Sequence, residues 1–379
     1  MRKISVLVFI LIVFLQVSLG FCFAKEPNPV RVAIAQDISA LRIKIEGFYE
    51  VINPKTNKVL YRGRHLNSTA TVYKGGILLA NVRPKSDRLF IRTYDPDEII
   101  INGRRFRGDI ELIKAPDAHL LAINHIGLES YVKGILFHEV SHYWPVEVLK
   151  TQAIVCRSYA LYQCQENKNK DFDVTNDTYS QVYGGLTSER LRTSKAVDET
   201  KGMVLFFNGK ILPAFFHATC GGFTENVSAL WNLQNSALSG VKCDFCKESP
   251  HFNWHCCLSA KEIEEKLLKA GIKIQGIKDI LVVSRNNSGR VVNLKVTGSE
   301  KEMDILAKDF RNIIGSNIIK STNFNVTSVK GDFIFEGLGW GHGVGLCQWG
   351  AYFMAKQGSK FEEILKFYYP GAEIISIGQ

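Results

Sequence analysis

The hydrophobic pattern of this chain changes its period near residue 117. In residues 30–116, short alternating runs such as residues 41–45 are separated by turn-forming pairs such as Asn53-Pro54, which is typical of strands and turns. Beyond residue 117, apolar residues recur at helical spacing, most clearly in residues 145–166. The sequence therefore predicts an α+β fold, with a β-rich N-terminal region at residues 30–116 followed by a mixed helix/strand domain at residues 117–379.

The second region contains the predicted helices and several further strands. Helices are expected at residues 129–140, 145–166, 259–270, 300–314, 348–356 and 360–369. Strands are expected at residues 203–207, 212–216, 280–284 and 291–296. Pro145 suits the first turn of its helix, because its missing N–H has no partner there in any case.

Composition narrows the class of protein. The chain has 379 residues, 46% of them hydrophobic, and a formal net charge of +10. These values suit one large or two ordinary globular domains and exclude a disordered chain, a coiled coil and a collagen-like fibre. Lys and Arg are interspersed with acidic residues, so we expect no nucleic-acid partner. The positive charge indicates a solvated surface or, alternatively, an anionic cell-wall polymer as partner.

The N-terminal segment has the layout of a secretion signal. Arg2 and Lys3 precede an uncharged stretch at residues 4–23, and Cys22 and Ala24 are small residues at the positions that a signal peptidase reads. We predict a signal peptide at residues 1–24 and an exported protein, in the periplasm or at the cell surface. A retained segment would instead anchor the protein, and this is the only membrane contact that we expect.

The cysteines fall into two classes. Cys156, Cys164 and Cys347 are isolated among apolar residues, which predicts buried thiols in the core. A second set is grouped, and Cys243 and Cys246 have the spacing of metal ligands. Candidate partners for a structural zinc or for disulfides are Cys220, His251, His255, Cys256 and Cys257. Both chemistries remain open, since an exported protein meets oxidising conditions.

Residues 138–142 match a zinc-protease pattern. On a helix, His138 and His142 could face one metal ion while Glu139 polarises its water. Pro145 follows closely, however, and no third ligand is evident in the sequence. A zinc metalloprotease therefore stays an alternative.

Several longer motifs occur in a fixed order between residues 110 and 370. They are residues 128–134, Glu139, residues 144–153 and 157–161, Gln181-Val182-Tyr183, residues 216–225, residues 339–345 and residues 348–351. In these motifs the chain resembles the SpoIID/LytB family. The resemblance implies an exported lytic transglycosylase of the sporulation branch that acts on peptidoglycan glycan strands, with Glu139 as the catalytic acid. The LytB branch implies the alternative of a non-catalytic protein that enhances a cell-wall amidase.

Lytic transglycosylation places one main demand on the protein. A protonated carboxyl gives its proton to the leaving glycosidic oxygen and then, as a carboxylate, takes one from the C6 hydroxyl of the sugar. The pKa of Glu139 must therefore be raised by a partly apolar site. No cofactor is expected to be required for this reaction.

The resemblance also implies residues that bind or orient the substrate. They are Lys150, Arg157, Tyr159, Gln181, Tyr183, His217, Thr219, Gly221, Thr224, Glu225, Gly341, His342, Gly343, Gly345, Gln348 and Trp349. We assign Arg157 to orienting Glu139 or to holding an anionic or acetamido group of the sugar. The motif before Gln181 departs from one subgroup of the family, because Thr175, Tyr179 and Ser180 stand where that subgroup has Cys-His-Cys ligands.

Glycines alternate strictly from residue 337 to residue 345. In an extended segment, alternate residues share one face, so these glycines would leave a face without side chains. A glycan strand could lie against that face, or the face could pack tightly inside the protein. Both interpretations stay open.

Overall fold

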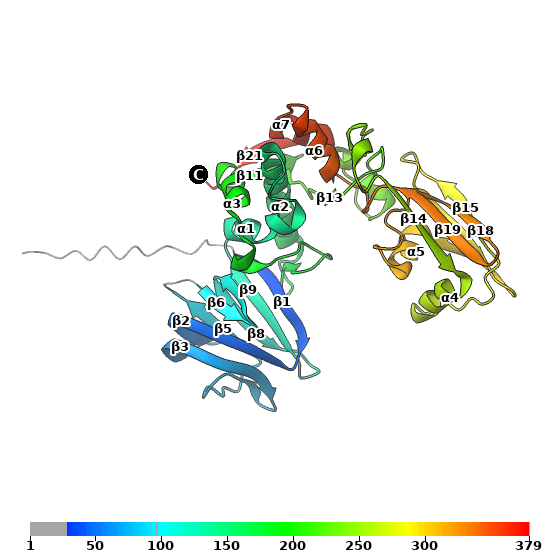
Figure 1. The fold of residues 1–379 in the computed structure, drawn as a ribbon. Helices are drawn as coiled ribbons and strands as arrows, with labels where there is room; N and C mark the ends of the chain where they lie inside the picture. Colours follow the sequence, from blue (N-terminus) through cyan, green and yellow to red (C-terminus); the bar gives the residue numbers. More distant parts are fainter. Residues whose placement is uncertain (1–28, 95–97, 379) are drawn as a thin grey trace, which may run out of the picture.

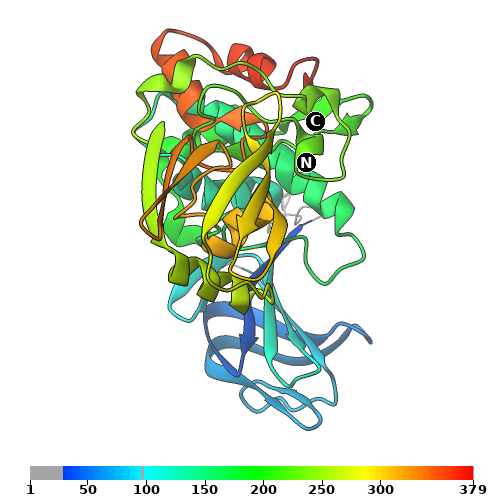
Figure 2. The same ribbon diagram turned by 90° about the vertical axis from the view of Figure 1, so that its right-hand side faces the viewer.

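The computed structural model describes residues 29–94 and 98–378. Figure 1 shows a β-rich N-terminal unit, a central helical unit and a second β-rich unit that projects from the helices. Figure 2 shows this second unit from the front, with the N-terminal sheet below. The predicted signal peptide lies outside the described residues. Within the described ranges, no helix has both the length and the apolarity that a membrane span requires.

The N-terminal unit is one curled sheet whose strand order is β10-β1-β9-β8-β5-β2-β3-β4, with β6 and β7 attached beside β2. Its strands are β1 (Val30–Ile38), β2 (Ala40–Asn53), β3 (Lys58–Tyr73), β4 (Gly76–Leu78), β5 (Arg88–Thr93), β6 (Glu98–Ile101), β7 (Arg104–Arg107), β8 (Asp109–Lys114), β9 (Leu120–Ile126) and β10 (Val174–Thr175). In β2, Leu41, Ile43 and Ile45 are buried while the residues between them are not, as the alternation predicts. The sheet continues through β9, beyond residue 116.

The central unit is organised around one long helix. Its helices are α1 (Leu128–Glu139), α2 (Val146–Glu166) and α3 (Leu191–Glu199). One side of α2, with Leu149 and Ala153, packs against the N-terminal core, and another side, with Ile154 and Val155, packs against a second core. Pro145 stands directly before the helix. Because α2 is buried on both sides, its position is fixed. Helix α1 packs against α2 and is positioned by it.

Short strands and two C-terminal helices complete the second core. They are β11 (Met203–Phe207), β12 (Lys210–Ile211), β13 (Phe216–His217), β20 (Leu346–Cys347), α6 (Gln348–Lys356), α7 (Phe361–Tyr368) and β21 (Glu373–Ser376). β13 pairs in parallel with β20, although about 130 residues separate them in sequence. The predicted strand at residues 212–216 is wrong for most of its length, since only Phe216 belongs to a strand.

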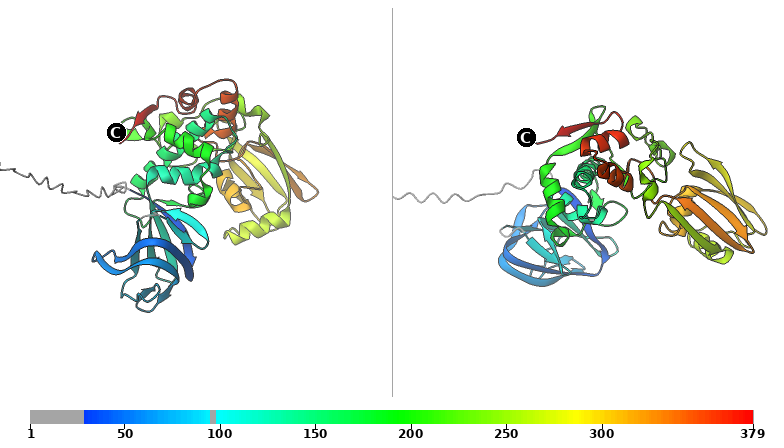
Figure 3. Two further views of the ribbon diagram at one scale, coloured as in Figure 1. Left: turned by 60° about the vertical axis from the view of Figure 1, so that its left-hand side comes forward. Right: turned by 45° about the horizontal axis from the view of Figure 1, so that its top comes forward.

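The residues between β13 and β20 include an inserted unit with a core of its own. Its elements are β14 (Asn253–Ser259), α4 (Ala260–Lys269), β15 (Asp279–Arg285), β16 (Val291–Thr297), β17 (Glu302–Leu306), α5 (Ala307–Ile314), β18 (Phe324–Val329) and β19 (Asp332–Leu338). Asn253 pairs with Leu338, so the chain enters and leaves the insertion at neighbouring points. The two views of Figure 3 show it beside the central helices. The helix predicted at residues 300–314 is wrong in its first half, which forms β17.

Candidate active site

Glu139 ends α1 and lines a pocket of about 350 Å³. The helix stops there because Val140 is extended and its N–H closes the last turn on the Leu136 carbonyl oxygen. Several of the residues predicted to bind substrate line this same pocket: Tyr159, Gln181, His217, Gly341, His342 and Gln348. The fold therefore brings motifs together that lie far apart in the sequence.

The environment of the Glu139 carboxyl group favours its protonated form. Burial raises the pKa of Glu139 from 4.5 to about 7, because the charged form loses its hydration. The Val182 N–H donates to Oε1 at 3.2 Å and only partly offsets this effect. No Lys or Arg of the described ranges lines the pocket. The site thus holds a carboxyl group that can carry a proton near neutral pH.

The Gln348 side chain forms a hydrogen bond to the backbone of Glu139. Its Nε2 donates to the Glu139 carbonyl oxygen at 3.0 Å and to Oε1 of Gln152 at 3.4 Å. Gln348 is the first residue of α6 and Gln152 belongs to α2. The end of α1 is therefore tied to both neighbouring helices.

Two neutral histidines line the pocket beside Glu139. Burial lowers the pKa of His217 well below 6.5 and that of His342 to about 4. Nδ1 of His217 donates to the Val344 carbonyl oxygen, and Nδ1 of His342 accepts from the Val344 N–H. These bonds leave a lone pair on Nε2 of His217 and a proton on Nε2 of His342. Nε2 of His217 is buried without a hydrogen-bond partner in the described part of the chain.

A larger groove of about 1120 Å³ adjoins the pocket and shares Tyr159, Tyr179, Phe215 and Trp231 with it. The Phe215 and Trp231 rings stack with their centroids 4.5 Å apart. The rest of the groove is rich in side-chain amides: Asn208, Asn226, Asn232, Gln234 and Asn235. Aromatic faces and neutral amides together suit a ligand that has both C–H faces and polar substituents.

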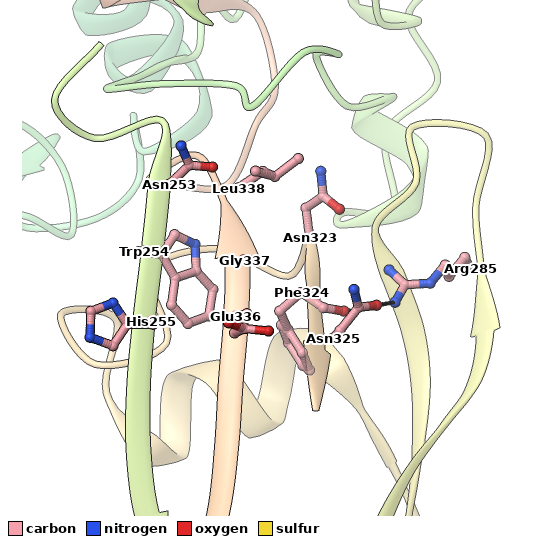
Figure 4. Close-up of a pocket in the computed structure, with 10 residues that line it drawn as sticks. All are labelled: Asn253, Trp254, His255, Arg285, Asn323, Phe324, Asn325, Glu336, Gly337 and Leu338. Carbon is pink, nitrogen blue, oxygen red and sulfur yellow. Dashed lines mark hydrogen bonds between the residues drawn. The ribbon is translucent and has the colours of Figure 1, made fainter. Parts of the chain in front are cut away.

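A second pocket lies wholly within the insertion (Figure 4). Its volume is about 520 Å³, and Trp254, Phe324 and Glu336 are among its lining residues. Nη2 of Arg285 donates to Oδ1 of Asn325 at its edge. None of the side chains predicted to bind substrate lines it, so we assign the site to the Glu139 pocket.

Comparison with known proteins agrees with the motifs. The sequence profile of the family described as stage II sporulation protein matches residues 117–207. Stage II sporulation protein D of Bacillus subtilis is 30% identical over 268 residues, which cover 67% of this chain and 76% of that protein. This chain belongs to the SpoIID/LytB family. The resemblance that the motifs indicated is thereby confirmed.

Two further relatives of this SpoIID/LytB chain differ in coverage. An uncharacterized protein of Brachyspira hyodysenteriae is 33% identical over 358 residues, or 94% of this chain and 95% of that protein. The amidase enhancer of Bacillus subtilis is 27% identical over 293 residues, or 65% of this chain but only 40% of that protein. A domain family of unknown function matches residues 225–345, which include the insertion.

Arg157 and Lys150 lie outside the pocket lining, and among the described residues their side chains pair with groups other than Glu139. The Arg157 guanidinium is buried and binds the Glu129 carboxylate in a bidentate pair, with N–O distances of 2.9 and 2.8 Å. It also donates to the Met203 carbonyl oxygen. Lys150 pairs with Glu199 on the protein surface. Arg157 therefore supports the packing of α1, α2 and β11.

Other residues expected at the site also lie outside the pocket lining: Tyr183, Thr219, Gly221, Thr224, Glu225, Gly343, Gly345 and Trp349. The Tyr183 hydroxyl donates to buried Asn124 in the N-terminal sheet. Glu225 accepts hydrogen bonds from Asn286 and Ser288 of the insertion. In this structure the Tyr183 and Glu225 side chains therefore bind other parts of the protein.

The glycine segment is not a strand with a bare face. Gly339, Gly341, Gly343 and Gly345 all have positive φ, between 72 and 116°. A Cβ on Gly345 would lie 2.0 Å from the Phe215 carbonyl oxygen, and one on Gly341 would lie 2.7 Å from Cβ of His217. The interpretation of the glycines as an extended floor is therefore wrong. The close approach of neighbouring backbone requires them.

We expect Gly343→Ala to lower the free energy of unfolding by at least about 3 kcal/mol. A Cβ there would lie 2.5 Å from Nη2 of the buried Arg290, and φ is +90°. Gly358→Ala is the matched control, because φ is +100° and nothing lies within 4 Å of the added atom. Chemical denaturation measures both variants. Equal losses would mean that Arg290 moves aside freely and would contradict the packing role.

The zinc-protease alternative is wrong for this chain. The helix ends at Glu139, so His142 lies outside it and does not share a helix face with His138. Nε2 of His138 binds the Ser188 hydroxyl at 2.6 Å. Both imidazoles instead contact the Phe137 ring, with centroid distances of 5.4 and 5.3 Å. Within the described ranges, neither histidine belongs to a group of metal-ligating side chains.

The cysteine group also needs correction. Cys347, expected as an isolated core thiol, lies with Cys220, Cys243 and Cys246, and their sulfur atoms are all within 4.8 Å of one another. The other expected members lie elsewhere. His251 packs against Trp340, and Cys256 and Cys257 belong to β14 of the insertion, as does His255.

Sequence reasoning missed part of the site. Phe215, Trp231 and Tyr179 line both the pocket and the adjoining groove. Phe215 stands directly before a family motif, which is a usable signal. Trp231 has no comparable signal, because an isolated tryptophan in an irregular segment is as compatible with core packing as with binding.

Proposed function

We propose that this protein is an exported cell-wall enzyme that cleaves peptidoglycan glycan strands by lytic transglycosylation. The observation that carries the proposal is the Glu139 carboxyl group, with a pKa of about 7 in a pocket that no Lys or Arg of the described residues lines. An acid that works near neutral pH needs this environment. The relative named stage II sporulation protein D supports a role in sporulation-type remodelling.

The reaction uses one carboxyl group twice. Protonated Glu139 donates to the glycosidic oxygen as the bond from that oxygen to C1 breaks. The C6 hydroxyl oxygen of the same sugar attacks C1, and the Glu139 carboxylate accepts the hydroxyl proton, which closes a 1,6-anhydro ring and restores the acid. The neutral imidazoles of His217 and His342 make the pocket polar without lowering the pKa of Glu139, and Nε2 of His217 supplies an acceptor for a sugar substituent.

The adjoining groove suits the rest of the strand. Sugar rings present C–H faces that pack on aromatic rings such as those of Phe215 and Trp231, and acetamido groups match the side-chain amides. No metal or other cofactor is needed for these steps. We place the protein in the periplasm or at the cell surface, on the basis of the signal peptide expected at residues 1–24.

An amidase-enhancing role is the second candidate, favoured by the relative named amidase enhancer. Incubation of the purified protein with denuded glycan strands and with intact sacculi, without any amidase, separates the two functions. The transglycosylase releases soluble fragments alone. An enhancer releases none alone and accelerates a cell-wall amidase when one is added, which would contradict our proposal.

The pH dependence of kcat/KM should follow the acid. Since Glu139 must be protonated in the free enzyme, we expect a plateau on the acid side and a fall of about tenfold per pH unit above about pH 7. Because the pKa of Glu139 is raised, the protonated, active form of the enzyme persists to higher pH. Initial rates on soluble glycan across the pH range measure this. A fall that already begins near pH 4.5, the ordinary pKa of a carboxyl group, would contradict the burial argument.

A further inference from the structure

Four cysteine sulfurs converge in the core, and one of them belongs to Cys347, the register partner of His217 and the residue before Gln348, which both line the pocket. Cys220 follows β13, Cys243 precedes the short 3-10 helix Phe245–Glu248 that contains Cys246, and Cys347 ends β20. All four side chains are buried, and their sulfur atoms lie within 4.8 Å of one another. No other group of three or more potential ligands occurs in the described residues.

We propose that these four cysteines bind one structural zinc ion as thiolates. Zn–S bonds of about 2.3 Å in a tetrahedron place sulfur atoms about 3.8 Å apart. The observed limit of 4.8 Å is close to that spacing. Four protein ligands complete the coordination and leave no open position for a substrate, so the role is structural.

Hydrogen bonds around the sulfur atoms favour thiolates. Sγ of Cys347 accepts from the N–H of Cys220 at 3.2 Å and from that of Gly350 at 3.3 Å. Cys347 thereby caps the N-terminus of α6, where the helix dipole favours negative charge. The Tyr368 hydroxyl lies 3.2 Å from Sγ of Cys243. Outer donors of this kind stabilise and orient metal-bound ligands.

A buried cation beside the cluster fits a negatively charged centre. Arg290 is 1% exposed, and its Nη2 donates to the Cys220 carbonyl oxygen at 2.7 Å. Its Nε and Nη1 make no hydrogen bond within the described residues, and Nε lies 3.7 Å from the Glu225 carboxylate. Zinc with four thiolates carries a net charge of minus two, which the Arg290 charge partly balances. Two neutral disulfides would leave Arg290 with Glu225 alone.

The ion would join the two strands that carry one wall of the pocket. His217 and Cys347 are register partners in the β13–β20 pair, and Gln348, which holds the Glu139 backbone, follows Cys347 directly. An irregular segment with short 3-10 helices and isolated bridges joins β13 to Cys243 and Cys246, and the insertion lies between Cys246 and β20. A metal ion bound by all four cysteines would restrain these segments, because the short strands β13 and β20 alone hold them weakly.

Elemental analysis of the full mature chain, purified without chelators, tests the proposal. We expect about one zinc per chain, and denatured protein treated with a chelator should show all eight cysteines outside residues 1–24 as free thiols. Absence of zinc together with a mass lowered by disulfide hydrogens would overturn it. Stoichiometric iron in place of zinc would overturn the choice of metal.

Variants locate the ion. Cys243→Ser and Cys347→Ser should each lose at least nine-tenths of the bound zinc and melt at lower temperature. Cys257→Ser is the matched control, since this cysteine is exposed and outside the cluster, and it should keep the full content. If the cluster variants fail to fold, cobalt exchanged into the wild-type protein gives the answer. Visible bands of tetrahedral cobalt with thiolate ligands support the site, and an octahedral spectrum contradicts it.

Discussion

Glu139→Gln should abolish the release of 1,6-anhydro fragments from glycan strands, with a loss of about a thousandfold or more. Glutamine keeps the shape of the side chain and can still accept the Val182 N–H, but it has no acidic proton to give to the glycosidic oxygen. Fragment release by equal amounts of folded protein measures the effect. His142→Ala is the matched control, since His142 is near in sequence but outside the pocket lining, and it should retain activity.

The stability of the same variant separates chemistry from folding. Because burial raises the pKa of Glu139 to about 7, the native state is destabilised as pH rises through that value and the carboxyl group must ionise. Glutamine removes this cost, so at about pH 8 the variant should melt no lower than the wild type. A variant that is inactive only because it unfolds would contradict the acid assignment, as would one with unchanged fragment release.

Arg157→Ala should lower the free energy of unfolding by about 3–5 kcal/mol. The change leaves the Glu129 carboxylate, whose side chain is 16% exposed, without its bidentate partner. It also removes the donor to the Met203 carbonyl oxygen and leaves a cavity between α1 and α2. Denaturant titration measures the loss. Lysine at this position should recover only part of it, because an ammonium group cannot form the fork.

Lys150→Ala is the matched control for this prediction. Lys150 lies seven residues earlier on α2, and its ion pair with Glu199 is at the surface, so the expected change is at most about 1 kcal/mol. If Arg157 instead held the sugar, its alanine variant would keep its stability and raise KM. That result would contradict the packing role that the structure gives it.

Local patterns predicted the elements whose burial is simple. The apolar residues at positions 149, 153, 156 and 160 all face the N-terminal core, and the predicted helix at residues 145–166 agrees with α2. The alternation in β2 likewise matches its buried face. These segments are long, and each presents regularly spaced apolar residues to the N-terminal core, which is the case in which periodicity is informative, although α2 also buries another side against the second core.

Errors arose where tertiary contacts decide the backbone. Residues 302–306 pair with β16 as a strand although they precede a helix directly. The glycines from residue 339 to residue 345 have positive φ because backbone and side chains from distant segments press against them. Alternation in sequence cannot distinguish that packing from an extended strand. The sequence patterns also do not show the limits of the insertion, because these limits are defined by the pairing of Asn253 with Leu338 in the structure.

The sequence predicts the residues at the centre of the candidate site but not the aromatic residues at its edges. Glu139, Gln181, His217, His342 and Gln348 lie in ordered motifs and meet at one pocket. Arg157 also lies in such a motif, but its side chain packs in the core. A motif gives the position of a residue in the sequence and does not show which groups its side chain contacts. The sequence predicts Cys347 correctly as a buried core residue but wrongly as an isolated one, because its cluster partners are distant in sequence.

Mass spectrometry of the products from denuded glycan strands, digested by the purified protein without an amidase, tests the central claim most directly. Our account predicts fragments that end in 1,6-anhydro-muramic acid, lighter by one water than hydrolysis products, and predicts that Glu139→Gln yields none. Fragments with ordinary reducing ends would contradict the transglycosylase mechanism, and intact strands after digestion with the folded wild-type protein would contradict catalysis itself.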